Sequence, residues 1–353
     1  MGYSTPFSNN NTHVLELVVA QTAVNTLTNT TTVTCRLQID PPSNSISWSL
    51  ISADNSYSMT FQGQTYTGNF TFDYRTNRDT DTIKSTVTKT ITHDAAGNGT
   101  ATTYARCDTV VLGDAVTGTS GNPNVLTLTK LPGTPTAAPT LTRNDAGTTV
   151  TVLSATSGTT ATITDYEYQQ STDNSTWGAA TSMGTDATID VTGLTATQTY
   201  WYQTRVRTAD GPGPWSASRN TLGAPATITA TRTGRNVAVT AGNATGDTIT
   251  GYFVQYSTNS GSTWSTAETM TSQSYTYNSL TPGLTYLFRV YAASASGNSG
   301  KTVSAGVFVS AGGKRWTGSA WDFGATAKRW NGSAWVDLTT AKRWNGSSWV
   351  DLS

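Results

Sequence analysis

The chain has 353 residues, of which 21 are basic and 21 acidic, so its formal net charge is zero. This balance argues against nucleic acid as the main partner, because binding to phosphates needs an excess of basic residues. It equally argues against attachment to a membrane surface through basic side chains. Only 12% of the residues are charged, about half the usual share, so hydroxyl and amide groups must supply the polar surface.

The composition predicts an all-β chain. Thr is abundant, and Thr loses rotamer freedom in a helix but fits a pleated sheet. The 32 Gly and 11 Pro residues supply turns, and no long stretch places apolar residues at helical spacing. No window approaches the roughly 18 consecutive apolar residues of a membrane span. We therefore expect tandem β-sandwiches and no membrane insertion.

Residues 1–132 are predicted to form an N-terminal β-sandwich. About 130 residues bury roughly two-thirds of the surface of their unfolded chain, which is enough for an independent core. The strands are expected from the alternation of apolar and polar residues. They are Val14–Ala20, Thr30–Ile39, Ser45–Ile51, Phe70–Tyr74, Ile83–Ile91, Gly99–Cys107 and Val125–Leu131.

Three segments of this domain carry a resemblance to phage tail proteins. Thr88–Gly99 runs from a strand through a His-Asp-Ala-Ala-Gly-Asn-Gly turn into the next strand. It is similar to the His-Asn-Ala-Asp-Gly turn that is common in tail proteins of long-tailed phages. Asn29–Val33 and Phe61–Phe70 extend the likeness. The resemblance implies an N-terminal, phage tail-like sandwich.

No catalytic or metal-binding motif stands out, so we expect no enzyme, no cofactor and no metal site. His13 and His93 are the two histidines, and the place of His93 at a predicted turn favours a packing role over that of a catalytic base. Residues 75–81 could offer oxygens to calcium, although a solvated loop is favoured. Sugar hydrolysis would need two carboxyl groups within about 10 Å of each other, and nothing in the sequence points to such a pair.

The two cysteines allow two interpretations. Cys35, Trp48 and Cys107 fit the loose Cys-Trp-Cys spacing of immunoglobulin-like sandwiches, which would place a disulfide in the core. The start of the chain, Met1–Pro6, has no basic region followed by an apolar core, so we expect no secretory signal. Assembly in a reducing cytoplasm favours two buried free thiols instead.

An internal repeat of about 86 residues follows the first domain. Each copy shows short predicted strands separated by turn clusters, which is typical of a β-sandwich. Matching residues are Pro139 and Pro225, Tyr166 and Tyr252, Trp177 and Trp264, Leu194 and Leu280, and Tyr200 and Tyr286. The predicted strands are 148–155, 166–170 and 200–209 in the first copy, and 236–240, 252–256 and 286–293 in the second.

Both copies resemble fibronectin type III domains. Leu194–Tyr200 and Leu280–Tyr286 match the family's leucine-to-tyrosine corner, and the segments that follow them resemble its penultimate strand. The early strands lack the family's usual core Trp, so we expect Trp177 and Trp264 to fill that space from a different strand. The resemblance implies an architecture and no particular ligand.

Linkers are predicted where turn residues cluster, at Leu131–Pro135, Gly223–Pro225 and Ala311–Gly313. All three are short, so the domains are expected to form a stiff, extended rod. The resulting divisions are residues 1–132, 133–223, 224–311 and 312–353.

The last division, 312–353, repeats every 14 residues. The copies begin at Lys314, Lys328 and Lys342, and each holds a Lys-Arg-Trp group followed by a second Trp. Asn-Gly in the second and third copies is a strong signal for a hairpin turn. Similar tryptophan repeats end many minor tail proteins of phages that infect actinobacteria, so this segment resembles theirs.

A two-residue loop at Asn331-Gly332 would pair Trp330 with Ser333 and Lys328 with Trp335. The two indoles would then share one face, where they would either clamp the hairpin or form a stacking platform for sugar rings. A three-residue loop would separate them. The candidate ligand-binding residues are Trp316, Trp321, Trp330, Trp335, Trp344, Trp349, Arg329 and Arg343.

Together these features predict a minor tail or tail-fibre protein of a phage virion, made in the host cytoplasm and released by lysis. Its expected partners are other tail proteins and a host cell-surface glycan. Single hairpins are too short to bury a core, so a homotrimer is expected. The alternatives are a carbohydrate-binding accessory module of a secreted bacterial protein and a polysaccharide depolymerase.

Overall fold

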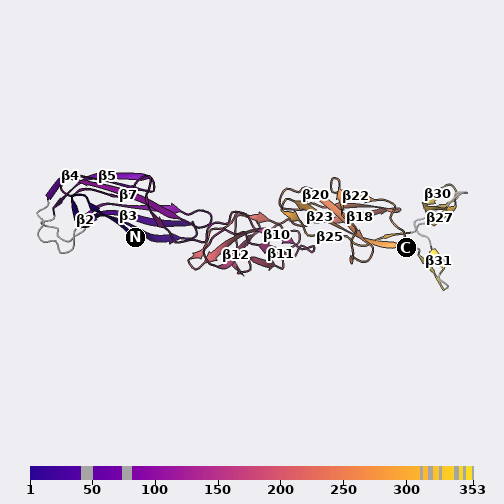
Figure 1. Cartoon of the computed structure of the whole chain (residues 1–353). Helices are drawn as coiled ribbons and strands as arrows, with labels where there is room; N and C mark the ends of the chain where they lie inside the picture. Colours follow the sequence, from indigo (N-terminus) through magenta and orange to yellow (C-terminus); the bar gives the residue numbers. More distant parts are fainter. Residues whose placement is uncertain are drawn as a thin grey trace.

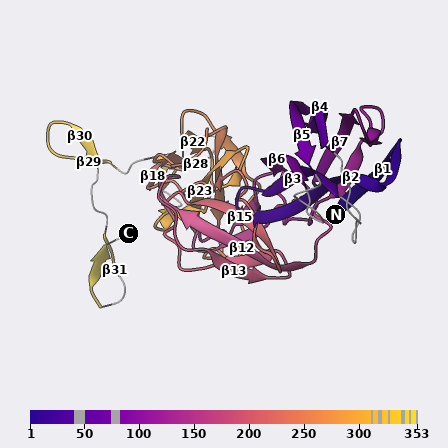
Figure 2. The same ribbon diagram turned by 90° about the vertical axis from the view of Figure 1, so that its left-hand side faces the viewer.

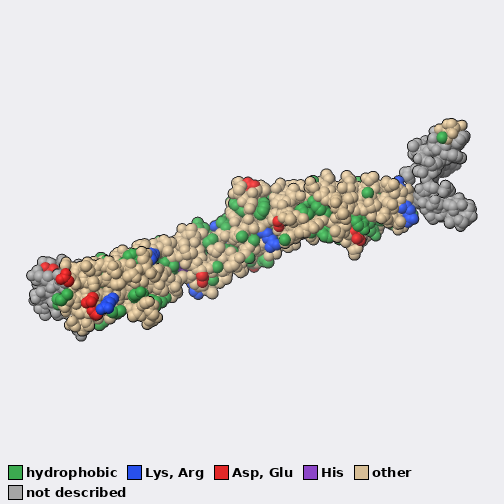
Figure 3. Space-filling view, turned by 90° about the horizontal axis from the view of Figure 1, so that it is seen from above, with side chains coloured by type: hydrophobic (Ala, Val, Ile, Leu, Met, Phe, Trp, Pro, Cys, Tyr) green, Lys and Arg blue, Asp and Glu red, His purple; other side chains and the backbone are tan. Residues whose placement is uncertain are grey.

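The described structure consists only of strands and their connections. It is a computed structural model that describes residues 1–40, 51–73, 82–310, 313–316, 321–325, 328–337, 342–344 and 347–351. The all-β prediction is confirmed, and among these residues there is no helix long and apolar enough to cross a bilayer. The sandwiches follow one another in a line, and the tail strands lie beyond the last of them (Figure 1). The surface in Figure 3 is mostly uncharged.

The N-terminal sandwich, residues 1–132, packs two antiparallel sheets around one core. The first sheet has the order β1 (Gly2–Phe7), β2 (Asn10–Asn25), β3 (Thr30–Asp40) and β6 (Thr82–Thr92). The second has the order β5 (Gln64–Asp73), β4 (Ile51–Phe61), β7 (Thr100–Thr109) and β8 (Gly113–Thr117), with β9 (Asn124–Thr127) paired to β7. Leu15, Leu17 and Leu37 are fully buried between the sheets, because successive strand residues face opposite sides.

One strand prediction needs correction here, and another lies almost wholly outside the described residues. The strand predicted at Ser45–Ile51 ends where β4 begins, and residues 41–50 lie outside the described part. The strand predicted at Phe70–Tyr74 is the end of β5, which starts at Gln64. β4 and β5 form one hairpin around Gln62 and Gly63, with φ values of 49° and 73°. Two positive φ values suit a tight hairpin turn, but β4 and β5 carry many small polar residues, so their apolar alternation is weak.

The outer strands of the first sheet are protected against pairing with other chains. β1 contains Pro6, which has no N–H to offer at a sheet edge. β6, at the opposite edge, points Lys89 inward, on the same side as the buried Ile91. The Lys89 ammonium donates to the carbonyl of Phe61 at 3.1 Å, across the gap between the sheets. Proline and inward-pointing charges are devices that discourage edge-to-edge association.

The first repeat, residues 133–223, is a second sandwich. One sheet has the order β10 (Thr140–Arg143), β11 (Val150–Leu153) and β14 (Thr188–Val191). The other has the order β13 (Thr181–Gly184), β12 (Ile163–Ser171), β15 (Trp201–Thr208) and β16 (Gly211–Pro212), with β17 (Arg219–Asn220) also on β15. Figure 2 shows β13, β12 and β15 side by side.

The second repeat, residues 224–311, has the same plan. One sheet has the order β18 (Ile228–Thr233), β19 (Asn236–Ala241) and β22 (Ser274–Tyr277). The other has the order β21 (Glu268–Met270), β20 (Gly251–Ser257), β23 (Leu284–Ser294) and β24 (Gly297–Asn298). β25 (Thr302–Val303) and β26 (Val307–Val309) also pair with β23. Tandem β-sandwiches, the fold class predicted from the sequence, are thus confirmed.

Both repeats have the predicted tyrosine corner. The Tyr200 hydroxyl accepts a hydrogen bond from the backbone N–H of Thr195 at 3.1 Å. The Tyr286 hydroxyl accepts one from the N–H of Thr281 at 3.0 Å. Such a bond fixes the crossing from one sheet to the other in sandwiches of this type.

The expectation that Trp177 and Trp264 fill the two cores is wrong. Neither belongs to the buried cluster of its repeat. The centre is filled instead by Tyr202 and its counterpart Phe288, which are fully buried. Trp264 lies on the outer face of its sheet, where the Arg289 guanidinium stacks 4.3 Å from the ring. Arg and Trp form favourable contacts of this kind at a surface.

The joint between the N-terminal sandwich and the first repeat is held by hydrogen bonds to the linker. Leu131 and Pro132 are buried, although a linker is usually exposed. From the sandwich side, the N–H of Leu131 donates to the carbonyl of Gly97 at 2.9 Å. From the repeat side, the hydroxyls of Ser157 and Thr159 donate to the carbonyls of Pro132 and Leu131 at 2.5 and 2.9 Å.

The joint between the two repeats is held by an ion cluster and a close backbone approach. Asp145 of the first repeat lies 2.7 Å from the Lys301 ammonium and 3.2 Å from the Arg289 guanidinium, both in the second repeat. The Lys301 N–H also donates to the carbonyl of Asp145 at 2.7 Å. A Cβ on Gly300 would lie only 2.6 Å from the Cα of Gly147, so the backbones meet where neither residue has a side chain.

Candidate functional site

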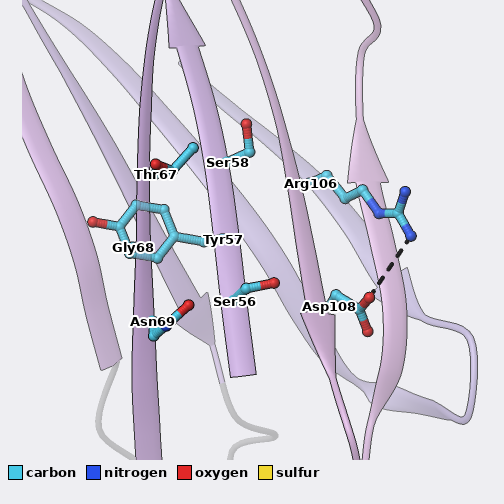
Figure 4. A pocket seen from close by; sticks show the side chains of 8 residues that line it. All are labelled: Ser56, Tyr57, Ser58, Thr67, Gly68, Asn69, Arg106 and Asp108. Atoms are coloured by element: carbon cyan, nitrogen blue, oxygen red, sulfur yellow. Dashed lines mark ion pairs between the residues drawn. The ribbon is translucent and has the colours of Figure 1, made fainter. Parts of the chain in front are cut away.

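A surface hollow of the N-terminal sandwich lies on the outer face of its second sheet. It has a volume of about 550 Å³ and is open to solvent (Figure 4). The central strand, β4, carries the short side chains of Ser56 and Ser58 on this face. The flanking strands carry longer ones. We call this hollow the trough, and its lining residues are Ser56, Tyr57, Ser58, Thr67, Gly68, Asn69, Arg106 and Asp108.

Strand register explains the arrangement of the trough. Ser56 lies between Asn69 of β5 and Asp108 of β7, and one row further along Ser58 lies between Thr67 and Arg106. Directly opposite residues of antiparallel strands share a face, so the two rows point the same way. A serine flanked by longer side chains in each row leaves a channel along β4.

The floor of the trough is closed from the opposite side of the sheet. Tyr57 alternates with the outward serines and packs against the core. Its ring lies beneath Gly68, where a Cβ would come within 2.7 Å of the ring. Any larger residue at position 68 would therefore displace Tyr57. The hollow is thus a surface channel, and it does not open into the core.

Polar side chains in the trough have unused hydrogen-bonding capacity. In the part of the chain that the structure describes, the side chains of Ser56, Ser58, Thr67 and Asn69 form no hydrogen bond with other protein groups. Elsewhere on the same domain, hydroxyls pair with one another, as Thr34 does with Thr88 at 2.9 Å. The trough therefore presents donors and acceptors that remain available to a bound molecule.

Charges gather at one side of the trough. Arg106 lies 2.7 Å from Asp114 and 3.8 Å from Asp108. The dashed line in Figure 4 marks the second of these ion pairs. Two carboxylates and one guanidinium leave a local charge of about −1, which disfavours an anionic ligand.

Asp108 and Asp114 are a close pair of exposed carboxylates, because both lie within 4 Å of the same guanidinium nitrogen. This is the separation that the depolymerase alternative requires. Sugar hydrolysis also needs one carboxyl group that stays protonated, usually in an apolar pocket. Here both side chains are about half exposed, at 56% and 47%, and both share Arg106 as a counter-ion. The environment is therefore unlike that of a catalytic acid.

A second hollow, of about 230 Å³, lies at the joint between the repeats. Its charged groups are already engaged. Asp145 holds Lys301 and Arg289, and Arg143 donates to the carbonyls of Gly147, Thr195, Gln198 and Leu222. Because these charged groups already bind other protein groups, we assign the hollow to the contact between the repeats and not to ligand binding.

His93 has the structural role that its position at a turn predicts. Its Nδ1 donates to the carbonyl of Gly97 at 2.9 Å, and its Nε2 is hydrogen-bonded to the hydroxyl of Thr31 at 2.8 Å. The carbonyl can only accept, so Nδ1 carries a proton. His13 is fully buried, and burial lowers its pKa. Neither histidine reaches the trough.

The structure leaves both cysteines as free thiols, as the second interpretation of the sequence predicts. Cys35 contacts Met59 and Thr103 in the core, and burial raises the pKa of its thiol. Burial raises the pKa of the Cys107 thiol to about 12.

Trp48 and residues 75–81, the calcium-loop candidate, lie outside the described residues. No cluster of three or more potential metal ligands occurs among the residues described.

The described part of the tail forms three two-stranded hairpins, but their register differs from the prediction. The strands are β27 (Gly313–Trp316) with β28 (Trp321–Ala325), β29 (Lys328–Trp330) with β30 (Trp335–Asp337), and β31 (Lys342–Trp344) with β32 (Trp349–Asp351). In each hairpin the two Trp residues are directly opposite: Trp316 pairs with Trp321, Trp330 with Trp335, and Trp344 with Trp349. Four residues therefore separate the strands, and the two-residue loop is wrong.

The middle hairpin shows why its loop is longer. The Asn331 side-chain oxygen accepts the backbone N–H groups of Ser333 and Ala334 at 3.0 and 2.8 Å. The Asn331 N–H donates to the carbonyl of Ala334 at 3.0 Å, and Gly332 has a φ of 102°. Asn thus caps a four-residue turn through its own side chain. The side chains of the Trp residues, and of Arg329 and Arg343, lie outside the described part, so their ligand-binding role stays a prediction.

No motif in the sequence points to the trough. Its residues come from three strands and are small and polar, a composition that is also normal for a solvent-exposed sheet face. Register was the missing information, because only the pairing of β4 with β5 and β7 brings these residues into two rows. Arg106, which supplies the guanidinium of the trough, is separated in the sequence by more than 30 positions from every trough residue except Asp108.

Comparison with known proteins places the chain among fibronectin-type sandwiches in one region. No curated protein sequence matches it. Among solved structures, it is similar to the FN1–FN3 domains of chicken CNTN1, with 12% identity, a TM-score of 0.27, and coverage of 82% of this chain and 95% of that one. A two-domain fibronectin type III segment of chicken tenascin has 15% identity and a TM-score of 0.23, covering 47% of this chain and 97% of that one. Residues 223–307 match the family model of the fibronectin type III domain, so the second repeat is a domain of that type.

Proposed function

We propose that this chain is a non-enzymatic attachment rod: a minor tail or tail-fibre protein of a long-tailed phage virion. The observation that carries the proposal is the way the sandwiches are joined. Each joint is fixed by direct contacts between neighbouring domains, and the sandwiches follow one another in a line (Figure 1). A stiff rod of this kind holds its two ends apart, which is what an attachment fibre must do.

The sequence supports the finer assignment. Phage-like segments in the N-terminal sandwich and Trp repeats in the tail occur in one chain. In the proposed arrangement the N-terminal sandwich docks on other tail proteins, the repeats act as spacers, and the Trp hairpins face the host. The hairpins would contact a cell-surface glycan, because Trp rings stack well on sugar rings and often dominate binding surfaces.

A homotrimer is part of this proposal. A single two-stranded hairpin is marginally stable in water, and in the described residues each tail hairpin pairs only with itself. Three chains around one axis would let hairpins support each other. Sedimentation equilibrium of the full chain should give three times the monomer mass. A monomer at micromolar concentration would contradict the trimer while leaving the virion assignment open to its own test.

Location in the virion is tested by mass spectrometry of purified particles of the phage that encodes this sequence. Peptides of the chain should be present, and labelled antibodies against the tail repeats should bind at the tail. Absence from intact particles would overturn the proposal. It would favour the alternative of a carbohydrate-binding accessory module of a secreted bacterial protein.

Host attachment through the hairpins is tested with a Trp330→Ala, Trp335→Ala double variant. Adsorption should be lost while particles still assemble and the tail stays protease-resistant. A Trp330→Phe, Trp335→Phe variant is the matched control, because it keeps an aromatic surface and should adsorb better than the Ala variant. Normal adsorption of the Ala variant would show that these residues do not bind the host.

A further inference from the structure

We propose that the trough on the N-terminal sandwich binds a neutral saccharide. The site is distinct from the Trp hairpins, which lie at the opposite end of the molecule (Figure 1). The proposal does not depend on a virion location, since it concerns a surface of the purified chain.

Available hydrogen-bonding groups carry the first step of the argument. The trough combines three hydroxyls, one carboxamide, a carboxylate and a guanidinium within two rows of adjacent side chains (Figure 4). Each sugar hydroxyl both donates and accepts, so it is matched best by a surface that offers both functions at close spacing. The side chains of Ser56, Ser58, Thr67 and Asn69 have no protein partner among the described residues, so a ligand would displace water and would break no hydrogen bond within the protein.

Charge carries the second step. Arg106 is flanked by Asp108 and Asp114, at 3.8 and 2.7 Å, and the local charge of about −1 repels phosphates, sulfates and uronic acids. A neutral sugar avoids that repulsion. It can also accept from the guanidinium N–H groups and donate to the two carboxylates, which are half exposed.

Shape carries the third step. The trough is open along β4 and lacks a deep apolar pocket, whereas peptides and drug-like ligands usually need an apolar anchor. Tyr104 lies two residues before Arg106 on β7, on the same face, opposite Thr60 of β4. It is only half buried. Tyr104 does not line the trough itself, but its register position directly beyond Arg106 on this face would let its ring contact a sugar that extends past the trough.

The expected affinity is low. A solvated surface site with few apolar contacts should bind a single oligosaccharide with a Kd of about 0.1–1 mM. Several copies in one assembly would bind a polysaccharide much more strongly through multivalency. A weak but specific site is therefore sufficient for surface recognition.

The test uses the full chain and defined neutral oligosaccharides of glucose, galactose, mannose and arabinose. Oligogalacturonate serves as the acidic comparator. Titration monitored by amide chemical shifts should perturb β4 and β7 with at least one neutral oligomer, and the acidic oligomer should bind at least about tenfold more weakly. Failure of all neutral oligomers to bind in the millimolar range, or stronger binding of the acidic oligomer, would overturn the proposal.

Two variants locate the site. Ser58→Tyr fills the trough, and Arg106→Gln removes its guanidinium. Each should weaken binding at least about tenfold, a change of about 1.4 kcal/mol. Thr90→Tyr is the matched control, because Thr90 is also an exposed strand residue but lies on the other sheet, and it should bind like the unmodified chain. Unchanged amide spectra away from the substitution confirm folding.

The outcomes separate this site from the proposed hairpin site. Binding lost in Ser58→Tyr and retained in the Trp330→Ala, Trp335→Ala variant supports the trough. The reverse pattern overturns the trough and leaves the attachment role intact. Release of reducing ends from the oligosaccharide, abolished by Asp108→Asn, would overturn a purely binding site in favour of hydrolysis.

Discussion

Each repeat forms its own sandwich, and the central strands of the two sandwiches pair in the same register. The repeats nevertheless differ at equivalent positions on the outer face of the sheet. In the first repeat Glu167 of β12 lies opposite Arg205 of β15, and the two side chains form an ion pair at 2.6 Å. Eighty-six positions later the equivalent pair is Phe253 and Tyr291, whose rings stack at 5.3 Å and an interplanar angle of 17°.

This difference teaches which residues specify the fold. Inward-facing positions keep their character in both repeats, since Val150 and Val152 match Val237 and Val239 as fully buried residues. Outward cross-strand pairs change from charged to aromatic without altering the register. Such pairs contribute roughly 0.2–1 kcal/mol each in ordinary surroundings. The core decides the architecture, and the outer face is free to acquire other roles.

The largest expected difference between the repeats concerns an arginine on the first strand of each. Arg143 lies opposite Val150 and donates to four backbone carbonyls. Burial also lowers its pKa. Arg143→Met would leave these carbonyls without their partner and should destabilise the first repeat by roughly 3 kcal/mol. Native-state hydrogen exchange of the β11 and β15 amides measures this locally.

Arg232 is the matched control in the second repeat. It lies opposite Val237, but it is exposed, and among the described residues its side chain donates hydrogen bonds to Gly234 and Ser310 alone. Arg232→Met should change the stability by less than about 0.5 kcal/mol. Equal effects of the two substitutions would show that the carbonyl contacts of Arg143 are not what stabilises the first repeat.

Transplanting the aromatic pair tests how interchangeable the outer faces are. Glu167 and Arg205 are only 11% and 13% exposed, so Glu167→Phe alone leaves the poorly solvated Arg205 without its partner and should cost roughly 2 kcal/mol. Arg205→Tyr alone should cost less, because Glu167 keeps Arg207 at 3.1 Å. The double variant should recover to within about 1 kcal/mol of the unmodified chain. Urea unfolding of the three variants measures the coupling. Additive losses in the double variant would mean that the first repeat cannot accommodate the stacked pair.

The joint between the repeats should be sensitive to one methyl group. Gly300→Ala places a Cβ about 2.6 Å from the Cα of Gly147, so the two backbones must move apart. We expect the docking of the two repeats to become weaker by roughly 1–2 kcal/mol of free energy. X-ray scattering should then show a broader distribution of shapes. Gly121→Ala is the control, because a Cβ there meets nothing within 4 Å. An unchanged scattering profile for Gly300→Ala would contradict a tight joint.

The smallest effect is expected at Asp145. Its side chain is 66% exposed, so its pairs with Arg289 and Lys301 are screened by solvent. Asp145→Asn should weaken the docking of the repeats by only about 0.5 kcal/mol. The signature is salt dependence: scattering of the unmodified chain should broaden with added salt more than that of the variant. Identical responses to salt would show that the ion pairs of Asp145 do not stabilise the joint and that its backbone contacts do.

Much of the architecture is predictable from sequence because it depends on local patterns. The tyrosine corners follow from Leu194–Tyr200 and Leu280–Tyr286, and both form the expected hydrogen bond. The two thiols also follow the expected pattern, since both occupy inward positions of strands. Trp177 and Trp264 were misplaced because a large apolar residue suggests a core, whereas Tyr202 and Phe288 already fill that space.

The candidate site was less predictable, for two physical reasons. In the tail, Asn331-Gly332 suits a two-residue turn equally well, and only the capping bonds from Ser333 and Ala334 to the Asn331 side chain select the longer loop. In the N-terminal sandwich, the trough depends on how β4 is paired on both sides. Neither a side-chain cap nor a two-sided register is encoded in short-range periodicity.

The protected edges of the N-terminal sandwich have a consequence for how closely such chains can be crowded. Pro6 and the inward-pointing Lys89 sit at the two edges of the same sheet. Pairing of crowded copies through the edges of this sheet is therefore disfavoured, because neither edge offers an uninterrupted ladder of backbone groups. At the β6 edge this protection depends on a single ammonium group, so we expect removal of the Lys89 charge to favour association through that edge.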